Sequence, residues 1–154
     1  MLEYLILGII FIILGYASFY DYKKLLVQNW TVSLILVFGV LYVIATNNII
    51  NSIGVLVFTI FIWGLPVFFG FGLGDTLLLL GLSLFLGSLT NMWNFYFILI
   101  IVWTIWTITM IYKYYYEHKI KRLKDIFRHE YPLVPVIAIS FYLWFLLSYI
   151  LPSL

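Results

Sequence analysis

The chain has 154 residues, of which 66% are hydrophobic and only 9% are charged. Soluble globular domains carry about 25% charged residues, so this composition indicates a protein whose solvent is lipid. With a net charge of +2 we expect no nucleic-acid partner. The absence of cysteine excludes disulfides, iron–sulfur clusters and thiolate zinc sites.

Apolar runs follow one another along the whole chain, and a helix needs about 20 such residues to cross a bilayer. The sequence predicts an all-α membrane protein of about six transmembrane helices in a polytopic bundle, at roughly 2–20, 30–46, 52–71, 75–89, 94–113 and 133–151. The fourth segment is short and needs neighbours to shield its ends. No Gly/Ser/Pro linker divides the chain, so we expect residues 1–154 to form one transmembrane domain. It would have a polar loop at about 112–131 and no separate soluble domain.

The first apolar run, Leu2 to Tyr20, has the length of a signal peptide but lacks its flanks. Glu3 is its only charge, no convincing small-residue cleavage site ends it, and Lys23 and Lys24 follow it at once. We therefore expect it to be a retained transmembrane helix.

The basic residues predict the orientation of the chain. Two lie in the first loop and six in the fifth, while the second and fourth loops hold none: Lys23, Lys24, Lys113, Lys119, Lys121, Arg122, Lys124 and Arg128. Cytoplasmic loops are rich in Lys and Arg, so loops one, three and five are expected in the cytoplasm. The sequence thus predicts a multi-pass plasma-membrane protein with both termini outside.

Two aspartates stand where apolar runs break. Asp21 ends the first predicted helix and Asp75 begins the fourth, which places both at the cytoplasmic face. Ionisable groups at membrane depth are costly and so mark functional sites. Two close carboxylates share one proton, and the pair can activate water and polarise a carbonyl, which is acid/base amide hydrolysis without a metal. Gly72 and Gly74 before Asp75 allow a substrate or a helix to approach closely.

These features also have plainer interpretations. A Gly-x-Gly-Asp motif is short enough to arise by chance, and Asp21 beside two lysines can be a solvated helix end. A non-enzymatic transport or ion-relay protein could use Asp21 and Asp75 as intramembrane carboxylates. In a structural assembly subunit the aspartates would merely pair with Lys23 or Lys24.

The segment DYKKLLVQNW at 21–30, followed by GLGD at 72–75, resembles the type IV prepilin peptidase family, and most closely its compact archaeal prepilin and preflagellin peptidases. The resemblance implies a six-helix GxGD membrane aspartyl protease with Asp21 and Asp75 as the catalytic pair. It implies a membrane-tethered prepilin or preflagellin substrate, whose short basic leader is cut off at the cytoplasmic face. Pro132 and Pro135 resemble the proline-bearing start of the family's last helix. Presenilin and signal peptide peptidase share the GxGD chemistry but have nine spans.

The chain departs from the family pattern at several positions. Val27, Gln28 and Asn29 stand where many members have Ile-Pro-Asn, and Thr76-Leu77 replace the Val-Lys of many bacterial members. The cysteine-bearing domain that accompanies pilin N-methylation is absent, so methyltransfer is not expected. The choice between pilin and flagellin precursors stays open.

The remaining polar and aromatic residues point to the membrane surface. Ile120, Leu123 and Phe127 recur at helical spacing, which predicts an amphipathic helix whose basic residues at 113–128 favour anionic lipid. His118 and His129 fit no metal-binding pattern, and we expect neither metal nor cofactor. We expect Trp103 and Trp106 to pack against neighbouring helices. Tyr20 and Tyr22 would either donate hydrogen bonds to Asp21 or lie at the lipid interface.

Overall fold

The computed structural model describes residues 2–67, 73–118 and 132–150, and this part of the chain is helical, with no strand. The expected all-α fold is therefore confirmed here. The elements in chain order are α1 (Leu2–Lys24), α2 (Asn29–Thr46), α3 (Ile49–Val67), α4 (Leu73–Leu86), α5 (Leu89–His118), α7 (Val134–Phe145) and the π-helical turn η1 (Leu146–Ile150).

A helix lies at each of the six predicted segments, but several ends differ. The helix α1 continues to Lys24, so Asp21 lies in a helical turn rather than in a loop. The helix α5 continues to His118, well into the stretch predicted as a polar loop. The predicted amphipathic helix and most of the basic segment at 113–128 lie outside the described residues.

Three helices are long and apolar enough to cross a membrane: Leu2–Lys24, Asn29–Thr46 and Leu89–Lys113. Three shorter apolar helices accompany them: Ile49–Ile62, Leu73–Leu86 and Val134–Ser148. A helix the length of α4 covers about 21 Å, which is less than a hydrocarbon core of about 30 Å. Three of the six expected membrane spans are thus helices with the length and composition needed to cross a bilayer.

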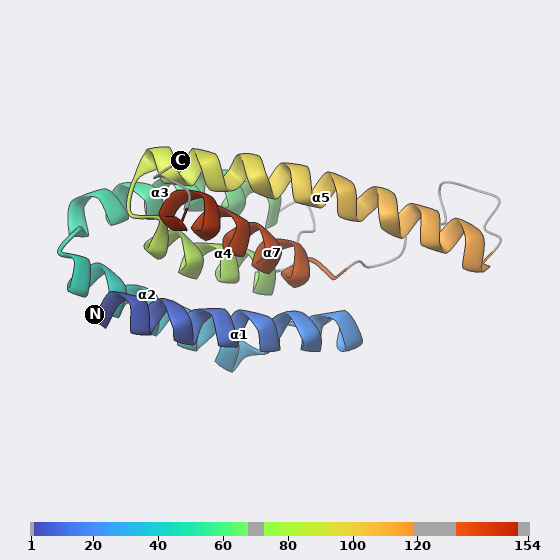
Figure 1. Cartoon of the computed structure of the whole chain (residues 1–154), viewed down its shortest axis with the longest axis horizontal. Coiled ribbons are helices and arrows are strands. Elements are labelled where there is room, and N and C mark those ends of the chain that lie inside the picture. The colour runs from blue at the N-terminus through green and yellow to red at the C-terminus, as the bar shows by residue number, and fades with distance from the viewer. Residues whose placement is uncertain (1, 68–72, 119–131, 151–154) are drawn as a thin grey trace.

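The helices run along one long axis of the molecule (Figure 1). The helix α7 packs against both α1 and α5, and α2 packs against α4. In Figure 1 α1 and α5 lie on opposite sides of α7, and the end of α5 extends beyond the other helices. The C-terminal end of α1 and the start of α7 consequently face the same end of the bundle.

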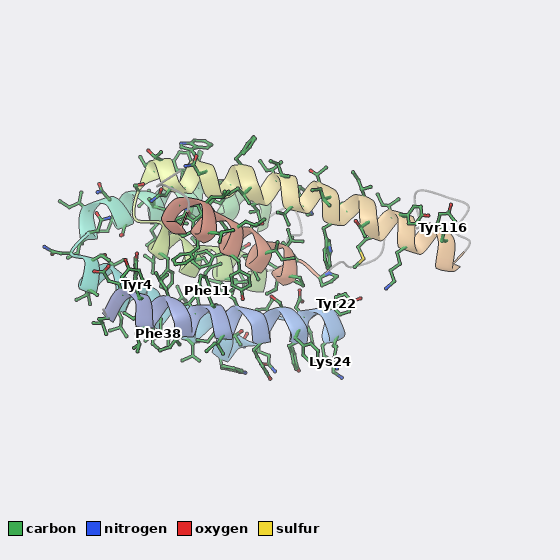
Figure 2. The ribbon with its side chains drawn as sticks, viewed as in Figure 1. Tyr4, Phe11, Tyr22, Lys24, Phe38 and Tyr116 are labelled. Carbon is green, nitrogen blue, oxygen red and sulfur yellow. The ribbon has the colours of Figure 1, made fainter. Side chains whose placement is uncertain are left out.

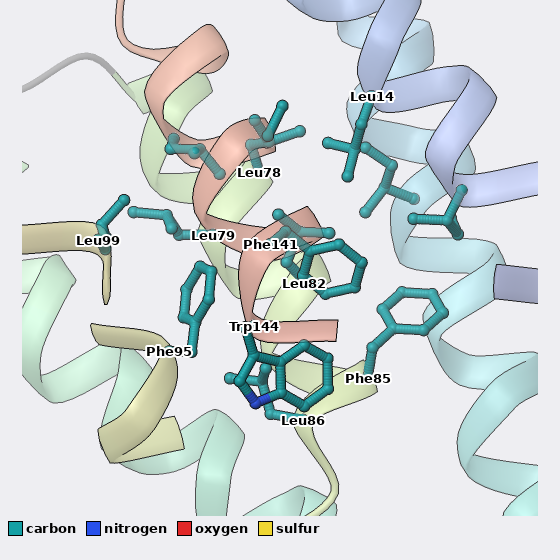
Figure 3. Packing of buried hydrophobic residues seen from close by; sticks show 14 of the residues in the cluster. Leu14, Leu78, Leu79, Leu82, Phe85, Leu86, Phe95, Leu99, Phe141 and Trp144 are labelled. Atoms are coloured by element: carbon teal, nitrogen blue, oxygen red, sulfur yellow. The ribbon is translucent and has the colours of Figure 1, made fainter. Parts of the chain in front are cut away.

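Large apolar side chains fill the interior of the bundle (Figure 3). Phe141 of α7 lies edge-on to Phe85 of α4 and Phe95 of α5, with ring centroids 6.2 and 6.3 Å apart. Phe11 of α1, labelled in Figure 2, makes edge contacts with Phe141 and Tyr142 of α7, with ring centroids 5.9 and 5.0 Å apart. Edge-to-face contacts of this kind add to the burial energy of the rings. They tie α1, α4 and α5 to the central helix α7.

The outward side chains are also apolar. Ile12, Ile50 and Phe61 are 75%, 86% and 68% exposed. Such extensive apolar surface is rare on soluble monomers and suits a lipid environment. Membrane association, expected from composition, is thus in keeping with the three long apolar helices.

Two glycines bring α2 and α4 into close contact. A Cβ atom at Gly39 would lie 3.1 Å from the Gly81 carbonyl oxygen, and one at Gly81 would lie 2.9 Å from Cγ2 of Ile35. Small residues of this kind let membrane helices approach without a side chain between their backbones. The α2–α4 contact therefore depends on the absence of side chains at both positions.

At the other end of the bundle, an asparagine links the α2–α3 connection to the α4–α5 connection. Asn48, between α2 and α3, donates from Nδ2 to the Gly87 carbonyl oxygen at 2.6 Å, and it accepts from Asn51 at 2.8 Å. Gly87 has φ = 66°, a left-handed conformation that glycine adopts without strain. The bond links the α2–α3 turn to the end of α4.

We expect Asn48→Ala to lower the free energy of unfolding by about 1–3 kcal/mol, because the Gly87 carbonyl loses its donor in a part-buried position. Thermal unfolding in detergent measures this change. Asn94→Ala, at an exposed position of α5, is the matched control and should stay within about 0.5 kcal/mol. Equal stability of the two variants would contradict the structural role of Asn48.

Candidate active site

Asp21 is buried in the last turn of α1, where its side chain is 4% exposed. Its Oδ2 accepts a hydrogen bond from the backbone N–H of Val134, the first residue of α7, at 3.0 Å. A backbone N–H at the start of a helix is unpaired within that helix and carries partial positive charge. The bond therefore fixes the carboxyl group and joins two helices that are 113 residues apart in sequence.

Asp75 is in the first turn of α4 and is partly buried. Its Oδ1 is buried and has no hydrogen-bond partner among the described residues. Gly74, the residue before it, lies against Val27 in the turn that follows Asp21. The two aspartates predicted to share a site thus lie at the same end of the bundle, and one carboxyl oxygen of Asp75 has no described donor.

A tight turn connects α1 to α2 next to Asp21. Leu25 has φ = 53°, a left-handed conformation that costs a residue with a Cβ atom roughly 1–2 kcal/mol. Its N–H binds the carbonyl oxygen of Asp21 at 2.8 Å, which closes the last turn of α1. The chain then reverses and carries Val27 to the start of α4, so the strained turn serves the assembly of the site.

Val27 explains why residue 74 is a glycine. A Cβ atom at Gly74 would lie 3.0 Å from the Cβ atom of Val27 and 3.4 Å from its Cγ2. The absent side chain lets the α1–α2 turn lie directly against the residue before Asp75. Gly72 lies outside the described residues, so the first glycine of the motif is not placed.

The residue after Val27 adds a second unpaired acceptor. Gln28 precedes α2, and its Oε1 is buried without a hydrogen-bond partner in the described part of the chain. Gln28 and Asp75 directly follow the touching pair Val27 and Gly74. No role for Gln28 was evident from the sequence, because an amide becomes informative only when its burial is known.

The tyrosines and the lysine next to Asp21 in the chain make no described contact with its carboxyl group. The ring of Tyr20 stacks on Tyr16 with centroids 6.4 Å apart, and Tyr22 is 50% exposed at the end of α1 (Figure 2). Lys23 holds its Nζ 4.2 Å from the centroid of the Phe19 ring. These placements fit the interfacial interpretation of the tyrosines and give no support to a pairing of Asp21 with Lys23.

An apolar cavity of about 280 Å³ lies beside α5, and neither aspartate lines it. One face of α5 lines it with Trp93, Tyr96, Leu99, Ile100 and Trp103. Single residues of α3 and α4 and the start of α7 complete the wall: Ile62, Leu79, Leu133 and Ile137. Of the two tryptophans expected to pack against neighbouring helices, Trp106 is partly buried against the core, whereas Trp103 lines this cavity and is 46% exposed.

Within the described residues no group of three or more His, Cys, Asp or Glu side chains could hold a metal ion. His118 ends α5, and His129 lies outside the described residues. Two neighbouring carboxyl groups can share a proton and can accept one from water or from a bound molecule.

Comparison with protein-family models, with curated proteins and with solved structures finds no match to this chain.

We expect Gly74→Val to lower the activity of the site by about a hundredfold, because the new side chain collides with Val27 and displaces Asp75 by about an ångström or more. The double variant Gly74→Val/Val27→Gly, which removes the colliding atoms, should recover part of that loss. Initial rates of peptide cleavage, the activity expected from two such carboxyl groups, measure both effects. A double variant no more active than the single one would show that the collision is not the cause.

Proposed function

We propose that the protein is a membrane aspartyl endopeptidase of the GxGD type, which removes the leader from prepilin-like or preflagellin precursors. The observation that carries the proposal is the placement of Asp21 and Asp75 at one end of the bundle, where the turn after α1 packs on the residue before Asp75. The resemblance of residues 21–30 and 72–75 to prepilin peptidases supports the same assignment.

In this proposal the two carboxyl groups share one proton. The ionised carboxylate takes a proton from water as the water oxygen attacks the scissile carbonyl, and the protonated partner donates a hydrogen bond to the carbonyl oxygen. Collapse of the tetrahedral intermediate breaks the C–N bond, and a proton passes to the leaving amine. Val134 keeps Asp21 oriented throughout, since the bond to its N–H needs no side-chain rearrangement.

The proposal includes six membrane crossings, with the shorter helices α3, α4 and α7 shielded by the longer ones. The described basic residues Lys23, Lys24 and Lys113 lie towards the C-terminal ends of α1 and α5, which point the same way in Figure 1. The site then faces the cytoplasm of a plasma-membrane protein, as the positive-inside rule requires. The basic leader of the precursor would reach it from that side.

The test is a cleavage assay in proteoliposomes that contain the wild-type protein and a panel of prepilin and preflagellin precursors. We expect at least one precursor to lose its leader at a single site, which mass spectrometry of both products identifies. Failure to cut any precursor, with the folded protein present at equal amount, would contradict the proposal.

A proton or cation relay is the second candidate, and the unpaired Oδ1 of Asp75 is the observation that favours it. A relay should give a flux that depends on membrane potential in the same proteoliposomes. A peptidase should leave them as tight as protein-free vesicles, so one preparation distinguishes the two functions.

A further inference from the structure

The apolar cavity shares its walls with the proposed active site. Leu79 lies four residues after Asp75 on α4, so both lie on one face of that helix, one turn apart. Leu133 directly precedes Val134, whose N–H holds Asp21. One end of the cavity therefore lies about one helical turn from both carboxyl groups.

The α5 wall shows how the cavity is reached. It runs from Trp93 to Trp103, a distance of about 15 Å along a helix axis. Ile100 and Trp103 are 59% and 46% exposed, so this wall extends to the outer surface of the bundle. A ligand can thus enter from the side that faces lipid in a membrane-embedded helix.

The size and chemistry of the cavity restrict its occupant. A volume of about 280 Å³ suits a few apolar side chains or an extended segment. The wall is apolar, because Tyr96 turns its hydroxyl group to Thr59 at 2.9 Å. A basic leader would lose its hydration there without gaining a partner.

An unpaired acceptor about one helical turn from the cavity favours a peptide over a lipid. The Oδ1 atom of Asp75 is buried and lacks a donor among the described residues. An extended peptide or its attacking water supplies a donor at this point, whereas the hydrocarbon chain of a lipid has none. The pairing of an apolar cavity with a free polar acceptor therefore favours a peptide.

On the basis of the proposed function, we infer that this cavity is the subsite for the apolar residues that follow the scissile bond of the precursor. The precursor enters sideways from the lipid, past the exposed wall of α5, and unwinds beside Asp75. Leu79, Ile100, Trp103 and Leu133 then determine which side chain is accepted directly after the cut.

The test compares two neighbouring isoleucines of α5. Ile100 lines the cavity, whereas Ile101 is 44% exposed and does not line it. Ile100→Trp and Ile101→Trp are each assayed with two precursors that differ only in having Leu or Ala directly after the scissile bond. We expect Ile100→Trp to lower the Leu/Ala ratio of kcat/KM about tenfold, since a pocket discriminates apolar side chains by such factors. Ile101→Trp should keep the wild-type ratio.

A ratio is used because partial misfolding lowers both rates equally and leaves it unchanged. A wild-type ratio in Ile100→Trp, in an enzyme that cleaves, would overturn the inference and leave the proposed function standing. If the wild-type protein cuts no precursor, the proposed function fails and the inference fails with it.

A photoreactive residue placed at Ile100 in the Asp75→Asn background gives a readout that needs no turnover. We expect it to cross-link to the precursor, at residues just after the cleavage site. Cross-linking to phospholipid alone, unchanged by added precursor, would assign the cavity to a lipid chain and overturn the inference.

Discussion

Asp21→Asn and Asp75→Asn are each expected to lower precursor cleavage by about 10,000-fold or more, since catalytic groups that act as a unit fail together. An amide keeps the size of the carboxyl group but cannot take a proton from water. The fold should survive both changes. In Asp21→Asn the amide oxygen can still accept the Val134 N–H, and Asp75 has an unpaired oxygen whose replacement breaks no described bond.

The rate is measured in proteoliposomes at equal protein content, with thermal unfolding as the check on folding. Glu3→Gln is the matched control, because it removes a carboxylate from the opposite end of the same helix. It should cleave at the wild-type rate. Cleavage that persists in either aspartate variant would exclude the two-aspartate mechanism and favour the ion relay.

Asp→Glu at either position is a finer probe of the same geometry. The charge is kept, but the carboxyl group is displaced by about 1 Å, which can cost about a hundredfold in rate. A relay tolerates this displacement far better, since a proton or cation needs no fixed line of attack. Wild-type cleavage by both glutamate variants would contradict a water shared between two positioned carboxyl groups.

Gly39→Leu is expected to disrupt the packing of α2 on α4 and to lower the free energy of unfolding by about 3 kcal/mol or more. The new Cβ atom would lie 2.8 Å from Cδ1 of Leu84, which can move, but also 3.1 Å from the Gly81 carbonyl oxygen, which belongs to the backbone. The helices must therefore separate. Asp75 on α4 would move with them, so cleavage should be lost as well.

Gly8→Leu and Gly54→Leu are the matched controls for this change. Both glycines lie within helices, and a Cβ atom at either position meets nothing within 4 Å. In detergent we expect both controls to unfold close to the wild-type temperature and to keep cleaving. If all three leucine variants were equally destabilised, loss of helical glycine itself, not the α2–α4 contact, would be the cause.

The helical architecture could be predicted from the sequence because apolar run length reports burial in lipid directly. Each predicted segment corresponds to a helix, and the breaks at Asn47 and Asn91 fall close to helix ends. The helix ends themselves depend on local bonds that composition does not contain. The bond from the Leu25 N–H to the Asp21 carbonyl, for instance, keeps Asp21 within the last turn of α1.

The sequence by itself determined the two candidate residues, Asp21 and Asp75, which are carboxylates at the edges of apolar runs. They stand out because charge at membrane depth is costly and is therefore rare in so apolar a chain. Only the tertiary structure decided how they are held. Val134 reaches Asp21 from 113 residues away, and Val27 packs on Gly74. The cavity is assembled from four helices. Such contacts arise from the packing of whole helices against one another. No local pattern of residues therefore encodes which backbone N–H or which methyl group will lie beside a given carboxyl group, or where a cavity will form.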